Sequence, residues 1–222
     1  GGNYQVTLER MNNPVNATSI AWDQTINATM ANITSQDVFS FTAQAGDKIS
    51  FGMRDRTGGA FDQYVVLRNA SGADIGQWEY VQDANTLVRT IPAAGTYYIW
   101  TWDVNYDSGG NYQVTLERMN NPVNATAINW GQTMNGTSVF ITAQDVYSFD
   151  AEQGDSVVIS LQNISGGGFN PYYILRDAVG AQVGDTVYNN GTIAFTILSN
   201  GTYYLWVYDA DYDAVGNYRF TL

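Results

Sequence analysis

Short runs of apolar and aromatic residues alternate with clusters of Gly, Asn, Asp and Ser every 8 to 12 residues or so, which is the spacing typical of short strands and turns. No long segment shows the 3.6-residue periodicity of an amphipathic helix. This pattern predicts an all-β protein with antiparallel β-sandwich domains of jelly-roll type. In the first half of the chain the clearest predicted strands are Ser19–Trp22, Asp37–Thr42, Lys48–Met53, Tyr64–Arg68, Thr86–Ile91, Thr96–Trp102 and Tyr112–Glu117.

The same pattern occurs twice in tandem. Residues 1–20 and residues 109–128 differ only where Ser19 is replaced by Ala127, and the similarity continues to GTYYIWTWD from Gly95 and GTYYLWVYD from Gly201. The chain ends on GNYRFTL, a third copy of the opening strand. The repeat unit is much longer than the roughly 20–50 residues of solenoid repeats, so each unit is a domain. We expect a surplus strand in residues 1–10, one β-sandwich in residues 11–118 and a second in residues 119–222.

The order of segments within each repeat resembles a known family. The first repeat contains DVFSFTAQAGDKISF, YVVLRNASGADI, IPAAGTYYIWTW and GGNYQVTLE, and the second contains DVYSFDAEQGDSVVIS, YYILRDAVGAQV, LSNGTYYLWVYD and GNYRFTL. Together they are similar to the bacterial pre-peptidase C-terminal (PPC) domain, a secreted β-sandwich module. The resemblance covers nearly the whole chain and implies tandem PPC-like repeats of a secreted or surface protein. In that family such domains are non-catalytic appendages of secreted enzymes or surface proteins.

Composition excludes several function classes. The 222 residues include no His and no Cys, which excludes disulfides, Ser-His-Asp and Cys-His hydrolases, and the usual zinc and haem sites. The net charge of −12 repels phosphate backbones, so we expect no nucleic-acid partner. There is no apolar run of about 18 residues that would span a membrane. There is also no initiator Met or signal peptide, so we expect a mature form or a fragment.

Catalysis is not expected. The acidic residues that could act as paired carboxylates lie in turns that recur in both repeats, and a duplicated turn is more simply structural. The single lysine, Lys48, is replaced by Ser156 in the second repeat, which argues against a Schiff-base lysine. We therefore predict a chain that is not an enzyme and has no catalytic residues.

The surplus strand is the most informative feature. If Gly110–Glu117 closes the first domain and the last residues close the second, residues 2–9 have no domain of their own, and a lone strand is unstable in water. Three interpretations remain open: the strand finishes a preceding domain of a longer array, it is donated to a neighbouring subunit, or it is a duplicated remnant that covers a sheet edge. Its apolar side chains are candidate interface residues: Tyr4, Val6 and Leu8.

A second candidate interface is an aromatic stripe. Because alternate residues of a strand face opposite sides, the prediction that Tyr97, Ile99 and Thr101 face the core leaves the aromatic neighbours on the outer face. Exposed aromatic patches mark contact sites. The alternatives are contact with another domain or subunit, a stacking platform for sugar rings, and cover by a loop of the same domain. The residues concerned are Tyr98, Trp100, Trp102, Tyr204, Trp206 and Tyr208.

Two acidic turns are candidate calcium sites. Oxygen-bearing side chains at alternate positions before a glycine suit a hard cation that takes six to eight oxygen ligands. The alternative is a turn in which Asp and Asn side chains accept hydrogen bonds from their own backbone. The candidate ligands are Asp103, Asn105 and Asp107 in the first repeat and Asp209, Asp211 and Asp213 in the second. No other cofactor is expected.

Asn-x-Ser/Thr sequences are in excess over chance and favour N-glycosylation of a surface-exposed protein, the alternative being a bias toward Asn and Thr in β-turns. The best candidates are Asn16 and Asn124, which lie in linkers next to Pro14 and Pro122. The full set is Asn16, Asn27, Asn32, Asn69, Asn124, Asn135, Asn163, Asn190 and Asn200.

These observations favour an extracellular or cell-surface structural protein. Its tandem sandwiches would assemble end to end into a filament, sheath or layer, with a mechanical and adhesive role. The partners would be copies of itself or neighbouring repeats, together with glycans. The alternative is a carbohydrate- or matrix-binding accessory module of a secreted hydrolase.

Overall fold

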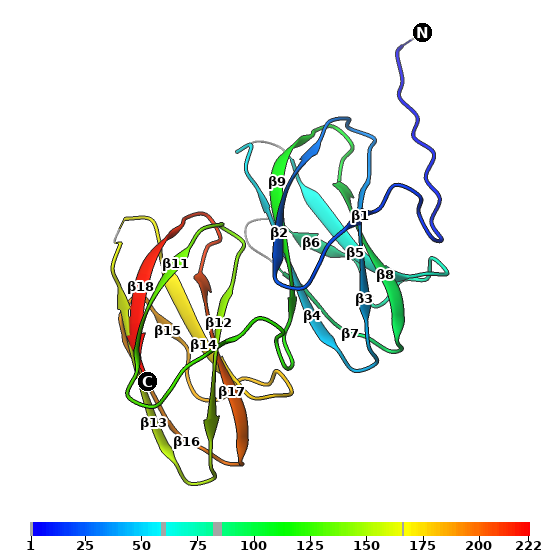
Figure 1. Cartoon of the computed structure of the whole chain (residues 1–222). Coiled ribbons are helices and arrows are strands. Elements are labelled where there is room, and N and C mark those ends of the chain that lie inside the picture. Colours follow the sequence, from blue (N-terminus) through cyan, green and yellow to red (C-terminus); the bar gives the residue numbers. More distant parts are fainter. Residues whose placement is uncertain (1, 59–60, 82–85, 166) are drawn as a thin grey trace. The chain divides into compact units, whose positions relative to one another are not determined.

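The computed structural model describes residues 2–58, 61–81, 86–165 and 167–222, which form strands joined by turns and loops (Figure 1). The chain divides into two compact units, unit 1 (Gly1–Leu116) and unit 2 (Glu117–Leu222). None of the described residues forms a helix long and apolar enough to cross a membrane.

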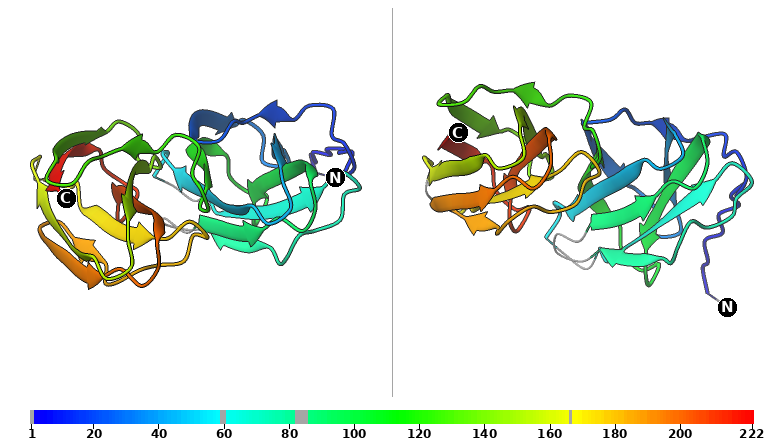
Figure 2. Two further views of the ribbon diagram at one scale, coloured as in Figure 1. Left: turned by 60° about the horizontal axis from the view of Figure 1, so that its bottom comes forward. Right: turned by 90° about the horizontal axis from the view of Figure 1, so that it is seen from below.

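Unit 1 is a sandwich of a five-stranded sheet, in the order β1-β3-β8-β5-β6, and a four-stranded sheet, in the order β2-β9-β4-β7. The two sheets pack face to face (Figure 2). The strands are β1 (Thr18–Ser19), β2 (Gln24–Met30), β3 (Asp37–Ala43), β4 (Lys48–Asp55), β5 (Gln63–Asn69), β6 (Glu79–Val81), β7 (Thr86–Thr90), β8 (Gly95–Asp103) and β9 (Gly110–Arg118).

Unit 2 has the same topology, with sheets in the orders β10-β12-β17-β14-β15 and β11-β18-β13-β16. The paired strands are antiparallel, except that β1 and β10 run parallel to β3 and β12. The predicted all-β sandwich fold is therefore confirmed. The strands are β10 (Thr126–Ala127), β11 (Thr133–Ser138), β12 (Asp145–Ala151), β13 (Ser156–Asn163), β14 (Pro171–Arg176), β15 (Val187–Tyr188), β16 (Gly191–Thr196), β17 (Gly201–Asp209) and β18 (Gly216–Thr221).

Each core is built from alternate residues of facing strands. In β4, Ile49, Phe51 and Met53 are buried on the inner face. The ring of Phe39 on β3 lies 5.9 Å from that of Phe51, so the core joins the two sheets. Tyr97 and Ile99 of β8 belong to the same cluster, as predicted. The inward-facing residues of the two sheets thus form one continuous apolar core between the sheets of each unit.

The last strand of each unit lies inside a sheet rather than at its edge. β9 is hydrogen-bonded between β2 and β4, and β18 between β11 and β13. Each of these closing strands also contacts the other sheet, because the hydroxyl of Tyr112 donates to Asp37 on β3 and that of Tyr218 donates to Asp145 on β12. Burial raises the pKa of Asp37, although the hydrogen bond from Tyr112 acts in the opposite direction. The closing strand therefore holds both sheets of its unit together.

Three strands differ from the sequence prediction. The predicted strand Ser19–Trp22 is replaced by the two-residue strand β1, because the chain turns after Ile20. β2 and β6 were not predicted. β2 reads QTINATM and lies at a sheet edge with its polar residues in solvent, so it lacks the apolar alternation that marks the other strands.

Neighbouring residues of β13 provide a test of the core. Ile159 is fully buried opposite Ile193, whereas Val158 is 53 % exposed on the other face. We expect Ile159→Ala to lower the free energy of unfolding of unit 2 by about 2–5 kcal/mol, since it leaves a cavity. Val158→Ala should cost less than about 1 kcal/mol. Denaturant unfolding measures both, and equal losses would contradict the assigned faces.

Candidate functional site

The aromatic stripe on the outer face of the five-stranded sheet is buried. Trp100 is 0 % exposed and Trp102 is 5 % exposed, and they form a second cluster with Val38, Val66 and Tyr98. Ala17 and Ala70, from segments of the same unit, pack against this cluster, and the guanidinium of Arg68 lies 5.2 Å from the Trp100 ring. The predicted exposure of Tyr98, Trp100 and Trp102 is therefore wrong, because loops of the same unit cover them.

Unit 2 repeats this arrangement. Tyr204 and Trp206 are buried in a cluster with Val146 and Ile174, and Tyr208 is half-buried at its margin. The predicted exposure of Tyr204 and Trp206 is wrong for the same reason. The ring nitrogens of Trp100 and Trp206 are buried, and neither has a hydrogen-bond partner among the described residues. Because they are buried, none of the three tryptophans Trp100, Trp102 and Trp206 presents a ring face on which a sugar could stack.

A different set of aromatic side chains reaches the surface of unit 1. Trp78, in the loop before β6, is 52 % exposed, and Tyr80 on β6 is 37 % exposed. The Trp78 ring lies 5.3 Å from Trp102 and 6.4 Å from Tyr64, and the Tyr80 ring lies 5.6 Å from Tyr64. We call Tyr64, Trp78 and Tyr80 the aromatic patch. It lies over the buried stripe and is the exposed continuation of it.

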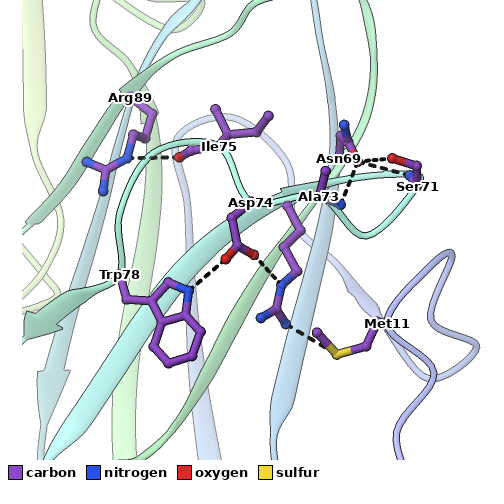
Figure 3. Close-up of polar contacts among 9 residues, drawn as sticks. Met11, Asn69, Ser71, Ala73, Asp74, Ile75, Trp78 and Arg89 are labelled. Atoms are coloured by element: carbon purple, nitrogen blue, oxygen red, sulfur yellow. Dashed lines mark hydrogen bonds and ion pairs between the residues drawn. The ribbon is translucent and has the colours of Figure 1, made fainter.

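Hydrogen bonds fix the position of Trp78 (Figure 3). Its ring nitrogen donates to Asp74 Oδ2 at 2.8 Å, and Arg68 Nε donates to Asp74 Oδ1 at 2.7 Å. Burial acts to raise the pKa of Asp74, but the hydrogen bonds from Trp78 and Arg68 and the charge of Arg68 outweigh it and lower that pKa. Asp74 therefore stays ionised and connects the exposed indole to a buried arginine.

The turn that carries Asp74 is also held in place. Asn69 Oδ1 accepts hydrogen bonds from the backbone of Ser71 and Ala73, and Arg89 Nε donates to the carbonyl of Ile75 (Figure 3). Arg89 Nη2 forms an ion pair with Glu79 at 2.8 Å beside the patch. The loop that presents Trp78 is thus constrained at both ends.

Unit 2 lacks a counterpart of Trp78. Thr186 and Gln182 occupy the positions that Trp78 and Asp74 hold in unit 1. Tyr172 and Tyr188 contact each other edge to face with ring centres 4.7 Å apart, as Tyr64 and Tyr80 do at 5.6 Å in unit 1. Reasoning from the sequence missed Trp78 because it followed the repeated features. A feature that occurs in only one repeat could have identified it, because Trp78 is a tryptophan with no aromatic counterpart in the other repeat.

The acidic turns serve the backbone. Asp103 is fully buried, and its carboxylate accepts hydrogen bonds from the amides of Asp62 at 2.9 Å and Asp107 at 3.0 Å. Asp209 does the same in unit 2 with the amides of Asn170 at 2.8 Å and Asp213 at 2.9 Å. These bonds agree with the alternative to a calcium site, which is a turn whose own side chains accept hydrogen bonds from its backbone.

The predicted calcium sites find no support in this geometry. Asn105, Asp107, Asp211 and Asp213 are exposed, while Asp103 and Asp209 point inward to backbone amides. Within the described parts of the chain, no three His, Cys, Asp or Glu side chains form a group that could hold a metal ion.

The asparagines of the nine glycosylation sequences differ in availability. Asn16 and Asn124 are exposed in loops, and the asparagines at 27, 32, 135, 190 and 200 are exposed as well. Asn69 and Asn163 are half-buried, and the Asn163 side-chain amide donates to the carbonyl of Phe169 at 2.7 Å. Glycosylation of Asn16 and Asn124 stays a prediction. The Asn163 amide also donates to Asn189 Oδ1 at 3.1 Å, and because a glycan replaces one of its two N–H groups, a glycan on Asn163 would remove one of these two hydrogen bonds.

The N-terminal segment, residues 2–9, pairs with no strand in the described structure and extends beside unit 1 (Figures 1 and 2). Its apolar side chains are largely in solvent, with Tyr4 87 % exposed, Val6 79 % and Leu8 95 %. This exposure is compatible with a role as interface residues but does not test it, so that role stays a prediction.

Comparisons with known proteins find a family model and a curated relative that each match part of the chain. Residues 143–209, in unit 2, match the family model described as the bacterial pre-peptidase C-terminal domain. A segment of the chain is 42 % identical over 69 residues to a probable subtilase-type serine protease of Deinococcus radiodurans. That match covers 28 % of this chain and 9 % of the relative, so the chain spans a small part of the relative's length.

Solved structures include the pre-peptidase C-terminal domain of a collagenase from Bacillus anthracis, which is 25 % identical with a TM-score of 0.36. The match covers 46 % of this chain and 96 % of that domain. Tripeptidyl peptidase 2 also matches, at 10 % identity and a TM-score of 0.33, over 92 % of this chain and 24 % of that one.

The buried carboxylates give a test of the two interpretations of the acidic turns. We expect Asp103→Ala to destabilise unit 1 by about 2–4 kcal/mol, because it leaves buried amides without an acceptor. Asp107→Ala, which removes an exposed side chain from the same turn, should cost about 0.5 kcal/mol or less. Thermal melts measure both. If calcium raised and EDTA lowered the melting temperature of the native chain, and neither changed that of Asp103→Ala, the result would support calcium binding at this turn.

Proposed function

Because the chain carries PPC-like β-sandwich domains, we propose that it is a non-catalytic, extracellular accessory module that attaches a secreted protein to a carbohydrate matrix. Two findings support a secreted accessory role: the family match of residues 143–209 and the identity to part of a subtilase-type protease. The observation that carries the binding function is the exposed, hydrogen-bonded Trp78 in the aromatic patch.

The aromatic patch has the physical properties of a stacking surface. An exposed indole offers a large apolar face to the C–H side of a sugar ring, and its burial on binding supplies most of the free energy. The bond between Trp78 and Asp74 fixes the ring before binding, so little conformational entropy is lost. Arg89 and Glu79 lie beside the patch and can exchange hydrogen bonds with ring hydroxyls.

The net charge indicates the class of glycan. At −12, the chain repels polyanions at long range, so uronic-acid or sulfated polymers are disfavoured. An uncharged polysaccharide, such as a β-linked glucan or chitin, suits an exposed aromatic side chain on a protein of this charge. The proposed ligand is therefore a neutral polysaccharide of a cell wall or extracellular matrix.

The absence of catalysis is part of this proposal. Of the acidic side chains that recur in both units, Asp103 and Asp209 are buried against backbone amides, where they cannot reach a substrate. Asp37 and Asp145 are engaged by tyrosine hydroxyls. With no His and no Cys in the chain, binding explains the exposed residues better than chemistry does.

End-to-end assembly into a surface filament, sheath or layer is a second proposal. One observation favours it, namely the exposed apolar face of the N-terminal segment. An extended strand with unpaired backbone and apolar side chains is suited to pairing with a sheet of another domain. Glycans on Asn16 and Asn124 would then lie on the surface of the assembly.

A matched pair of tryptophan variants tests the binding function. Trp78 and Trp130 are 52 % and 50 % exposed, and Trp130 packs on Phe149 of unit 2 without an aromatic patch around it. We expect Trp78→Ala to weaken binding to insoluble cellulose, chitin or β-glucan by about ten- to thirtyfold, the loss typical of an interface hot spot. Trp130→Ala should bind like the native chain.

Pull-down with the insoluble polymers, followed by titration with soluble oligosaccharides, gives the affinities. Equal binding by the native chain and Trp78→Ala would refute the role of the patch. A native chain that binds none of these neutral polymers would refute the proposed ligand class.

A further inference from the structure

The N-terminal segment has the same sequence as a strand whose complete environment is known. Residues 1–10 and residues 109–118 both read GGNYQVTLER. In the second copy, β9 pairs with β2 from Gln24 opposite Leu116 to Met30 opposite Gly110, and its other edge pairs with β4. The contacts of β9 therefore describe the environment for which residues 2–9 are suited.

The two copies differ most in burial. Tyr112, Val114 and Leu116 are 0 % exposed in unit 1. Their counterparts Tyr4, Val6 and Leu8 are 79–95 % exposed. The N-terminal segment thus leaves in water the same apolar face that β9 buries in a core, and hydrophobic burial favours its transfer to such a site.

Unit 1 does not itself supply that site. Its place between β2 and β4 is occupied by β9. Leu8 borders a groove of about 820 Å³ with Ile26 and Val38, yet it stays 95 % exposed, so this groove does not bury the segment. These facts argue against a remnant that covers an edge of its own domain.

The turn that follows residues 2–9 has the same hydrogen bonds as the turn that follows β9. Arg10 Nε donates to the carbonyl of Asn13 at 3.0 Å, and Arg118 Nε donates to that of Asn121 at 3.0 Å. Both asparagines have positive φ, 45° and 47°. The turn that connects a closing strand to the domain after it is therefore present and folded after residue 9 as well.

We propose that residues 2–9 are a donated closing strand, which completes another β-sandwich of this fold by taking the place that β9 holds between β2 and β4. This inference deepens the second proposal, on end-to-end assembly. The acceptor is a PPC-like sandwich whose closing-strand position is open. Tyr4 would supply the cross-sheet hydrogen bond to the acceptor's counterpart of Asp37, since Tyr112 makes that bond in unit 1.

Unit 2 provides an acceptor for a direct test. Residues 2–8 and 216–222 are identical at five of seven positions, differing only where Gln5 and Val6 correspond to Arg219 and Phe220. Removing residues 216–222 from the full chain opens the position between β11 and β13. We expect the chain of residues 1–215 to form head-to-tail oligomers whose mean mass rises with concentration, and unit 2 to keep a cooperative thermal transition.

Two double variants of the 1–215 chain distinguish strand donation from aggregation. Val6→Asp with Leu8→Asp places charges on the face that must be buried, and should give monomers without the unit 2 transition. Asn3→Asp with Gln5→Asp adds the same charge at positions whose counterparts, Asn217 and Arg219, are exposed, and should still assemble. In the 222-residue chain the first pair should leave both melting temperatures unchanged, since the two side chains lie in solvent.

Sedimentation and calorimetry measure these outcomes. Equal behaviour of the two double variants, or a monomeric 1–215 chain, would overturn the proposal. A full-length variant, Arg219→Gln with Phe220→Val, gives the closing strand of unit 2 the sequence of residues 2–8. It should retain the unit 2 transition, and loss of that transition would equally overturn the proposal. Polysaccharide binding through Trp78, measured on the 222-residue Val6→Asp, Leu8→Asp chain, reports on the proposed matrix-binding function separately.

Discussion

The insertion of the last strand into the middle of a sheet is the constraint on which each sandwich depends. β9 separates β2 from β4, so the four-stranded sheet has no continuous hydrogen bonding until the end of the domain is in place. The pairing is strongly non-local, as the hydrogen bond between the hydroxyls of Thr25 and Thr115 shows, since these residues are 90 positions apart in the sequence. Such topologies fold slowly, because the entropy of closing a long loop is lost before the contacts form. The closing strand is therefore the last element in the chain that the four-stranded sheet needs.

Polar contacts, and not disulfides, hold the loops of each unit, since the chain contains no cysteine. Without disulfides, the loops that join the two sheets are fixed by buried carboxylates, Asp103 and Asp209, which each gather several backbone amides. A charged acceptor makes stronger hydrogen bonds than a neutral one, and its burial is tolerated because the amides satisfy it. The same residues that suggested calcium therefore act as internal anchors of the chain, which explains why both repeats contain them.

The strands rich in apolar and aromatic residues could be predicted from the sequence, and the polar or very short strands could not. β3, β4 and β9 carry large apolar side chains at alternate positions and β8 is buried on both faces, whereas the polar edge strand β2 and the short β6 lack such a signal. Alternation also placed Trp100 on the correct face of its sheet. It could not show that Ala17 and Ala70, distant in sequence, pack over that face. Burial of an outer face depends on where loops return, and strand periodicity contains no information about loops.

The same limit explains why the aromatic patch emerged only from the structure. Trp78 lies in a loop, and its exposure depends on Asp74, Arg68 and the turn at Asn69 rather than on any periodic pattern. Repetition favours features that hold the fold, since those must recur in every unit, whereas a binding function needs only one copy. A tryptophan that the second repeat replaces with Thr186 is therefore less constrained by folding than the duplicated Trp100 and Trp206. In a duplicated chain, the departures from the repeat are the positions at which function can be separated from stability.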